Sequence, residues 1–274
     1  MGKWSWEILY YGRMLVPPEY LFEGITKPVE TPYAGFLLRN GTQNVLVDCG
    51  VSEDYFVDGK AFAGFPAVGG ASFVIDALGR ENLTPDDIDV VLYTHLHNDH
   101  AGNCDLFPKA KHVFQRDEWT NLTEPLPTQI LRKDYDPGVI PKLRKLDTIP
   151  VEGDFEFLPG LFLYKTPGHT LGHQIITVDT EKGRVLLLGD LCNDYLHFFP
   201  DLDIFTDMYG NSCKVKRKPA LAITPAEPSS IVYDHYEWYA SVYKAKALTL
   251  NRRELVLPGH EWSLFVGKLP RRRD

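Results

Sequence analysis

Short apolar runs separated by turn residues recur along the chain and predict strands. The runs at 34–38 and 44–47 flank Asn40-Gly41, a dipeptide typical of tight hairpin turns. A third strand is predicted over 89–94. Further β-rich segments follow at 161–164, 184–188 and 254–257.

Between these runs, apolar residues also recur at helical spacing. One set lies between Gly70 and Gly79, which we expect to end the helix: Phe73, Val74, Ala77 and Leu78. Thr84-Pro85 predicts a second, short helix, because Thr caps helices and Pro suits their first position. A later set shares one helical face: Ile231, Trp238, Val242 and Ala245. Because strands and helices alternate, the predicted class is α/β.

Two stretches do not fit this alternation. Segment 124–141 is rich in proline, and segment 198–228 is rich in aromatic residues, proline and lysine. Long irregular connections in a compact domain are often binding loops or lids. We therefore expect either pocket-lining loops or ordered surface loops without a function at these two places.

Composition favours one globular unit. A chain of 274 residues that is 44% hydrophobic can bury one large core, and no linker-like or repetitive segment divides it. We therefore expect a single domain over 1–274. Apolar runs long enough to span a bilayer and the zones of a signal peptide are both missing from the sequence, so we expect a soluble, cytoplasmic protein.

Net charge limits the class of partner that we expect, and cysteine spacing indicates the state of the thiols. A formal net charge of −8 disfavours a nucleic-acid substrate, and the basic end 271–273 is short enough to be a solvated tail. The expected partner is a small-molecule substrate, with no nucleic acid or membrane, and a homodimer stays open. The four cysteines form no C-x-x-C pair, which favours reduced thiols, and Cys192 is expected to be a buried structural thiol.

Four apolar runs each lead into a residue that can bind a metal ion. Those residues are His95, His169, Asp190 and His260. Ligands that follow strands converge where neighbouring strands end together, which is where α/β proteins commonly build sites. Glycine directly precedes the last three of them and lets the backbone turn sharply. The sequence therefore predicts a metal site at one edge of the sheets.

The segment 94–100, Thr-His-Leu-His-Asn-Asp-His, concentrates this chemistry. Burying so many ionisable groups costs several kcal/mol unless a cation compensates. In an extended stretch His95 and His97 point to the same side and can hold one ion. The turn that follows can direct Asp99 and His100 to a second ion. We therefore expect two neighbouring divalent ions.

The pattern resembles the metallo-β-lactamase superfamily. The H-x-H-x-D-H motif stands at 95–100, the TPGHT motif at 166–170, and the later Asp and Gly-His follow in order. The resemblance implies a four-layer αββα sandwich with the metals at one edge of the sheets. It places His95, His97 and His169 on the first metal. It assigns the other ligands as Asp99, His100 and His260 on the second metal, with Asp190 as the bridge.

Within the superfamily, the sequence is most similar to the N-acyl homoserine lactonase and pyridoxolactonase branch, through its size and the runs HLHNDHAG and TPGHTLGH. Enzymes of the β-lactamase branch carry Cys in place of Asp190, so a lactam substrate is not expected. The resemblance implies a metal-dependent hydrolase that opens a lactone or related carboxylic ester by attack of a metal-bridging hydroxide. Asp99 could pass the proton to the leaving oxygen.

The lactonase pattern is not complete. Those families carry Tyr three residues after the bridging Asp, whereas here the nearest is Tyr195, five residues after it. Tyr195 is therefore either the oxyanion donor or a packing aromatic. Asn98 replaces an apolar residue common there. A set of aromatics could wall an apolar pocket or belong to the core: Phe198, Phe199, Phe205 and Tyr209.

Several alternatives stay open. The ligand set suits Zn, with Mn, Fe and Co as alternatives. A thioesterase of the glyoxalase II type, or another phospho- or carboxyl-ester hydrolase of the superfamily, would use the same ligands. A flavodiiron-like protein would have Glu in place of His97 and a flavin domain, which are both missing here. Among the remaining histidines, His173 is expected to support the ligands and His197 could line the pocket.

Overall fold

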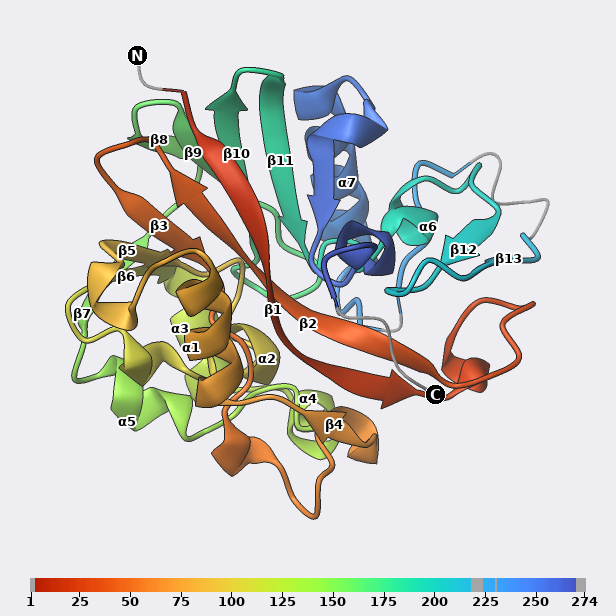
Figure 1. Cartoon of the computed structure of the whole chain (residues 1–274), viewed down its shortest axis with the longest axis horizontal. Coiled ribbons are helices and arrows are strands. Elements are labelled where there is room, and N and C mark those ends of the chain that lie inside the picture. The colour runs from red at the N-terminus through yellow and green to blue at the C-terminus, as the bar shows by residue number, and fades with distance from the viewer. Residues whose placement is uncertain (1–2, 218–223, 230, 270–274) are drawn as a thin grey trace.

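The strands form two mixed sheets that lie face to face. The structure is a computed structural model that describes residues 3–217, 224–229 and 231–269; the basic end and part of the segment 198–228 lie outside these ranges. Within them, the first sheet has the order β4-β1-β2-β3-β5-β6-β7 and the second β14-β11-β10-β9-β8. A two-stranded hairpin, β12-β13, stands apart from both (Figure 1).

The strands of the first sheet are β1 (Ser5–Val16), β2 (Val29–Arg39), β3 (Asn44–Val47), β4 (Ala67–Val68), β5 (Val90–Leu92), β6 (Lys111–Gln115) and β7 (Asp147–Val151). Those of the second are β8 (Phe155–Leu158), β9 (Leu161–Lys165), β10 (Gln174–Thr180), β11 (Gly183–Gly189) and β14 (Val256–Pro258). The hairpin consists of β12 (Ile204–Thr206) and β13 (Ser212–Lys214).

The α-helices are α1 (Ala71–Arg80), α2 (Asn98–Ala101), α3 (Arg116–Thr123), α4 (Pro127–Arg132), α5 (Val139–Leu143), α6 (Tyr195–Phe198) and α7 (His235–Thr249). Single 3-10 turns are η1 (Pro18–Tyr20), η2 (Glu53–Tyr55), η3 (Phe62–Gly64), η4 (Pro85–Asp87), η5 (Cys104–Leu106), η7 (Arg253–Leu255) and η8 (Trp262–Phe265). No helix in the described ranges is long and apolar enough to cross a membrane.

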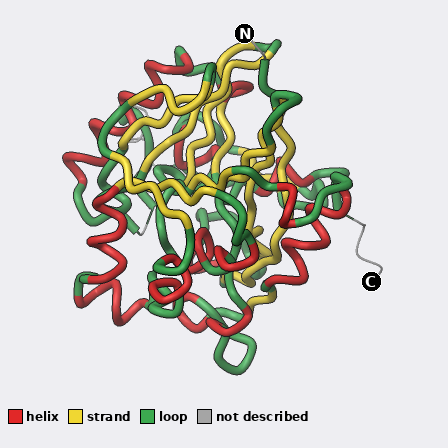
Figure 2. Tube along the Cα trace, turned by 90° about the vertical axis from the view of Figure 1, so that its left-hand side faces the viewer, coloured by secondary structure: helices red, strands yellow, loops and turns green. Residues whose placement is uncertain are grey.

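Side chains of alternate residues in each strand point to opposite faces of the sheet, so they pack in different layers of the fold. In β3, Val45 and Val47 face the core between the two sheets, whereas Leu46 faces the opposite way. The outer face of the first sheet packs on α1, α3 and α5, and that of the second on α7 (Figure 1). Figure 2 shows the strands in the middle with helical segments around them. The fold is therefore the αββα sandwich that the resemblance implies.

Strand direction brings the candidate ligands to one edge. β3, β5, β6 and β7 pair in parallel, and so do β11 and β14. β9 and β11 both pair antiparallel with β10, so they run the same way. The loops that follow β9, β11 and β14 therefore leave the second sheet at the same end. Together with the loop after β5, they carry the residues that sequence analysis singled out.

Some predicted elements need correction. The proline-rich segment 124–141 contains α4 and α5, and Pro127 is the first residue of α4, where proline is favoured. Helix α1 runs through Gly79 and ends one residue later. Ile231 lies before α7, outside the helical face assigned to it. The twelve-residue strand β1 was not predicted.

Candidate metal centre

The segment after β5 folds as an extended stretch that turns into the short helix α2. His95 and His97 precede the helix, and Asp99 and His100 belong to it. This change of backbone separates the four side chains into two directions, as predicted for two neighbouring ions. Three groups of metal-binding side chains result: His95, His97 and His169; His95, His100 and Asp190; and Asp99, His100 and His260.

The first group has the spacing of a tetrahedral site. Nε2 of His169 lies 3.2 Å from Nε2 of His95 and 3.2 Å from Nδ1 of His97. Nitrogen ligands about 2.0–2.1 Å from a tetrahedral Zn²⁺ lie about 3.3 Å from one another. The three imidazoles are therefore placed to bind one cation together.

Asp190 lies between the two groups. Its Oδ2 is 3.7 Å from Nε2 of His169, whereas its Oδ1 is 3.5 Å from Nε2 of His100 and 3.3 Å from Nε2 of His260. On the far side, Asp99 lies 3.7 Å from His100 and 3.6 Å from His260. One carboxylate oxygen therefore faces each group, which is the geometry of a bridging ligand.

In three of the candidate ligands, the ring nitrogen that points away from the cluster is hydrogen-bonded to another residue of the protein. Nδ1 of His169 donates to the Ile231 carbonyl and that of His260 to the Pro32 carbonyl, each over 2.8 Å. Nδ1 of His100 lies 2.8 Å from a carboxylate oxygen of Asp48. These bonds orient the rings so that Nε2 faces the cluster and is the atom available to a metal ion, as a metal-binding imidazole requires.

Burial and crowding set the protonation of the cluster. Burial and the neighbouring imidazoles hold the pKa of His95 and His97 well below the usual 6.5, which favours the neutral form that binds metal. Burial opposes charge on His260 as well, but the carboxylates of Asp190 and Asp99 raise its pKa to about 9.

Orphaned polar atoms support a metal as the missing partner. Nε2 of His100 and Oδ1 of Asp190 are buried and have no hydrogen-bond partner. Buried polar groups without partners are rare in native proteins. Because both atoms point at the same cluster of donors, the side chains present fit a pair of divalent ions with nitrogen and oxygen ligands.

Sequence reasoning missed Asp48 and Glu118, which position the ligands. Asp48 follows β3, so the strand-end pattern that identified the ligands could have found it; its carboxylate also accepts from Thr94 N, 2.8 Å away. Glu118 is fully buried on α3 and accepts from the backbone N–H groups of Leu96 and Gly172, each over 2.9 Å. Its position within an ordinary helix gave no signal.

Comparison with known proteins identifies the family. The family model described as the metallo-beta-lactamase superfamily matches residues 32–260, a range that includes all seven candidate ligands. The chain belongs to the metallo-β-lactamase superfamily.

Among curated proteins, it is 31% identical to N-acyl homoserine lactonase AiiA of Bacillus thuringiensis subsp. kurstaki over 175 residues, which is 60% of this chain and 65% of that protein. The N-acyl homoserine lactonase AttM of Agrobacterium fabrum is 30% identical over 174 residues, 58% of this chain and 64% of that protein. The chain thus spans less than two thirds of these relatives.

Solved structures of the superfamily share the fold over a longer range. An N-acyl homoserine lactone hydrolase with N-hexanoyl-L-homoserine bound at its catalytic metal center has a TM-score of 0.71 at 23% identity, covering 95% of this chain and 94% of that one. AidC, a dizinc quorum-quenching lactonase, has a TM-score of 0.64 at 14% identity, covering 95% and 88%. At these low sequence identities, the structural similarity shows that the fold is shared and shows nothing about the activity of this chain.

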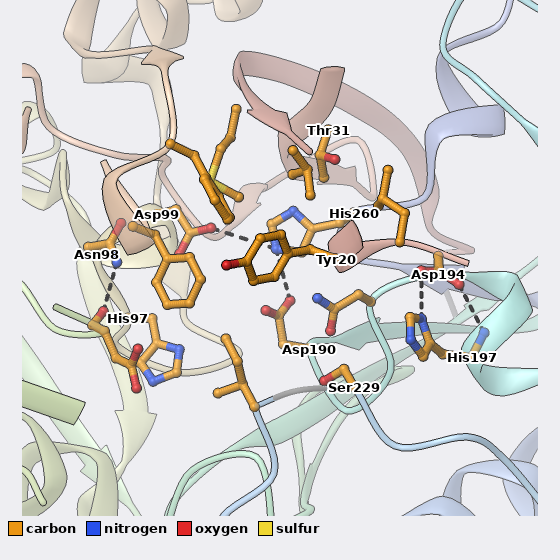
Figure 3. A pocket seen from close by; sticks show the side chains of 18 of the residues that line it. Tyr20, Thr31, His97, Asn98, Asp99, Asp190, Asp194, His197, Ser229 and His260 are labelled. Atoms are coloured by element: carbon orange, nitrogen blue, oxygen red, sulfur yellow. Dashed lines mark hydrogen bonds and ion pairs between the residues drawn. The ribbon is translucent and has the colours of Figure 1, made fainter. Parts of the chain in front are cut away.

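The cluster of candidate metal ligands opens into a pocket that has a polar side and an apolar side. Asp99, Asp190 and His260 line its base (Figure 3). The apolar lining comes from the N-terminal strand, the loop after it and η3: Met14, Val16, Tyr20, Leu21, Phe62 and Phe65. His197 also lines the pocket, as sequence analysis considered. Asn98 lies on the wall, where its amide nitrogen donates to the carbonyls of Lys133 and Asp134.

Tyr195 does not reach this pocket. Its hydroxyl donates to the Val256 carbonyl over 2.8 Å, its ring packs beside Phe199, and Arg253 lies over its face. It is not among the residues that line the pocket. The expectation of an oxyanion donor is therefore wrong for Tyr195, because the turn after Asp190 directs the side chain into the second sheet's outer layer.

The four aromatic residues that could have formed a wall of the pocket do not line it. Phe198 and Phe199 pack in the core beside α7, Phe205 packs between the sheets, and Tyr209 donates to Glu30. They belong to the structure around the pocket and do not line it. Cys192 is buried without a disulfide, as expected.

His173 supports the ligands as expected. Its Nε2 accepts from Asp190 N over 3.2 Å, and its Nδ1 lies 2.9 Å from the Thr166 hydroxyl. The ring therefore connects Thr166, at the start of the loop that carries His169, to Asp190, which directly follows β11.

Proposed function

We propose that the protein is a metal-dependent hydrolase that opens the ring of a lactone, or cleaves a related carboxylic ester, at a dinuclear centre. The observation that carries this proposal is the split of seven ligands into two groups joined by Asp190, at the base of a pocket with an apolar side. Its similarity to N-acyl homoserine lactonases supports a lactone as the substrate.

When bound, two divalent ions would polarise the ester carbonyl and lower the pKa of a shared water. The residues of the chain determine where this happens. His95, His97 and His169 hold one position, and Asp99, His100 and His260 hold the other, with Asp190 between them. The apolar side of the pocket excludes water from the acyl or alkyl part of the substrate.

Asp99 is the residue best placed to move a proton. Its carboxylate lies beside His100 and His260 and also faces the pocket, so a substrate oxygen can approach it. Because a carboxylate that binds a cation through one oxygen keeps its other oxygen as an acceptor, Asp99 can take a proton from the attacking water and return it to the leaving alkoxide.

A substrate panel tests the proposal. Metal-quantified protein is given γ-lactones, linear esters, thioesters and phosphodiesters at equal concentration, and hydrolysis is followed as proton release for the oxygen esters and as free thiol for the thioesters. The γ-lactones are expected to react fastest. Faster thioester cleavage would favour the glyoxalase II type of thioesterase, and faster phosphodiester cleavage a phosphoesterase of the same superfamily.

A further inference from the structure

Asn193, on the turn after β11, carries a side-chain amide that the protein itself does not use. The Oδ1 atom is buried without a hydrogen-bond partner, and the amide forms no side-chain hydrogen bond with the residues that the structure describes. Asn193 lines the pocket together with Asp99, Asp190 and His260. Since buried polar groups are nearly always paired in native proteins, a molecule in the pocket is expected to supply the missing partner.

The backbone of this turn is held in place by its neighbours. Nε1 of Trp238 donates to the Leu191 carbonyl over 2.6 Å, and the backbone N of His260 donates to the Asn193 carbonyl over 2.9 Å. Asn193 is thus tied to the loop that carries one of the candidate metal ligands. A donor on a fixed backbone needs little rearrangement when negative charge develops beside it.

The turn also places the amide beside the expected reaction. Asp190 precedes Asn193 by three residues, and His260 is bonded to its backbone, so the amide belongs to the same end of the pocket as these two candidate ligands. In the proposed hydrolysis, the oxygen of water bonds to the ester carbonyl carbon, the carbonyl π electrons move to the carbonyl oxygen, and the water proton passes to Asp99. Hydrogen-bond donors near that oxygen stabilise the oxyanion. Nδ2 of Asn193 offers two N–H groups for this purpose.

Three other donors near the cluster are less well placed for this role. The amide nitrogen of Asn98 already donates to two backbone carbonyls, and the hydroxyl of Tyr195 donates to a third, outside the pocket. Figure 3 shows Thr31 on the far side of His260 from Asp190. The amide of the turn is therefore better suited than these side chains to bind an oxygen atom that reacts at the cluster.

We propose that Asn193 is a catalytic residue whose Nδ2 donates a hydrogen bond to the carbonyl oxygen of the substrate and stabilises the oxyanion that forms there. This inference rests on the proposed hydrolysis of a lactone or ester and adds a residue to it. Because the hydrogen bond strengthens as negative charge develops, the amide lowers the barrier more than it tightens substrate binding. Its loss is therefore expected to reduce kcat and to leave KM nearly unchanged.

Two variants of Asn193 test this role in metal-replete protein, with γ-decalactone as the substrate. In Asn193→Ala we expect kcat to fall about 100- to 1000-fold, the effect of losing one oxyanion donor, with KM within about threefold of wild type. Asn193→Asp keeps the size of the side chain but replaces the donor by a charged acceptor, so kcat should fall at least as far. Asn251→Asp is the control for the added charge, because Asn251 is exposed after α7 and its side chain accepts from Lys246.

Stability and metal content separate a catalytic role from a structural one. Asn193→Ala removes an unpaired polar atom and no hydrogen bond within the protein, so the urea midpoint of unfolding should not fall below that of wild type. Zinc content measured by elemental analysis should also match wild type, because the seven candidate ligands are unchanged. A structural role would instead lower the midpoint or the zinc content together with the rate.

Binding of a tetrahedral analogue gives a measurement that does not depend on turnover. The cyclic phosphonate that corresponds to the γ-lactone carries a negatively charged oxygen where the oxyanion forms. Its affinity, measured by calorimetry on zinc-loaded protein, should be at least tenfold lower for Asn193→Ala than for wild type, since the donor binds the charged oxygen. The affinity for Asn251→Asp should equal that of wild type.

The outcomes separate this inference from the proposed function. If the wild-type protein neither opens γ-decalactone nor binds the phosphonate, the proposed function fails and the inference fails with it. If the wild-type protein opens the lactone and Asn193→Ala keeps both its kcat and its phosphonate affinity, the proposed function stands, the amide binds only water, and the catalytic role of Asn193 is refuted.

Discussion

Oδ2 of Asp48 lies 2.8 Å from Nδ1 of His100, and the same carboxylate accepts from both the backbone and the hydroxyl of Thr94. Asp48 thus connects the end of β3 to the segment 94–100, which carries four of the candidate ligands. A carboxylate on the outer nitrogen of a ligating imidazole fixes its tautomer and makes it more basic. Asp48 therefore sets how firmly His100 can hold a cation.

Replacing this carboxylate should weaken metal binding. In Asp48→Asn the amide nitrogen would face either the Thr94 amide or the His100 N–H, donor against donor. We expect metal affinity to fall about 10- to 100-fold, the usual effect of losing such a partner. Competition with a chromophoric chelator measures it, with Asp86→Asn, an exposed carboxylate, as the control. Equal affinities in Asp48→Asn and wild type would contradict this role.

Glu118 should matter for the whole cluster. Its two oxygens accept from Leu96 N, between His95 and His97, and from Gly172 N, in the loop that carries His169. Glu118→Gln places an amide N–H against one of these donors, so we expect a loss of about 2 kcal/mol in the free energy of unfolding, and a lower metal content.

Chemical denaturation and elemental analysis measure these two effects of Glu118→Gln. The neighbouring Asp117→Asn is the control: Asp117 is half exposed and forms only a surface ion pair with Lys165, so its removal should change stability by less than about 1 kcal/mol. The same small effect in both variants would show that Glu118 does not organise the site.

Tyr195 should be a stability residue. Tyr195→Phe removes the hydrogen bond to the Val256 carbonyl, which is worth about 1 kcal/mol of unfolding free energy. The rate of the proposed lactone hydrolysis should stay within about threefold of wild type, because the side chain lies outside the pocket. A loss of kcat by a factor of a hundred in a folded, metal-replete variant would return Tyr195 to the oxyanion role.

The sequence predicted which His and Asp side chains cluster better than it predicted the residues around them. Four of the candidate ligands follow apolar runs that form strands, namely His95, His169, Asp190 and His260. Parallel pairing of β11 with β14 then places Asp190 beside His260. The direction of Tyr195 depends on the turn after Asp190 and on packing against α7, which no local pattern records. The pocket's apolar side comes from β1 and the loop after it, far along the chain from the ligands.

Local signals also explain the elements that were missed or misplaced. In β1 the apolar residues do not alternate strictly, because the register with β2 shifts between Tyr10 and Gly12, which leaves Tyr11 unpaired with β2. Helices α4 and α5 have only six and five residues, too few for a helical period to show. In contrast, the run 44–47 was predicted with its observed bounds, since both of its neighbours are strands and every apolar side chain is buried.

His112 predicts a loss of stability in acid. Its Nε2 donates to the Phe107 carbonyl and its Nδ1 accepts from the Tyr93 hydroxyl, so the buried ring is neutral. Burial holds its pKa below 6.5 in the folded chain. Between 6.5 and that lower value the unfolded chain binds the proton first, so acidification favours unfolding.

The wild-type free energy of unfolding should therefore fall more steeply than that of His112→Gln as the pH decreases below 6.5, by up to about 1.4 kcal/mol per pH unit. Urea denaturation from pH 7.5 to pH 5 measures the difference between the two proteins. Parallel curves would mean that His112 has the same pKa in the folded and unfolded chains.

Titration of metal-free protein with Zn²⁺, followed by the rate at which it opens a γ-lactone, tests the central claim most directly. The account predicts no ring opening without metal and a rate that rises to a break at two ions per chain. Asp190→Asn, which lacks the bridging carboxylate, should approach neither this stoichiometry nor this rate. Full activity at one ion per chain, or ring opening that does not depend on metal, would contradict the dinuclear lactone hydrolase proposed here.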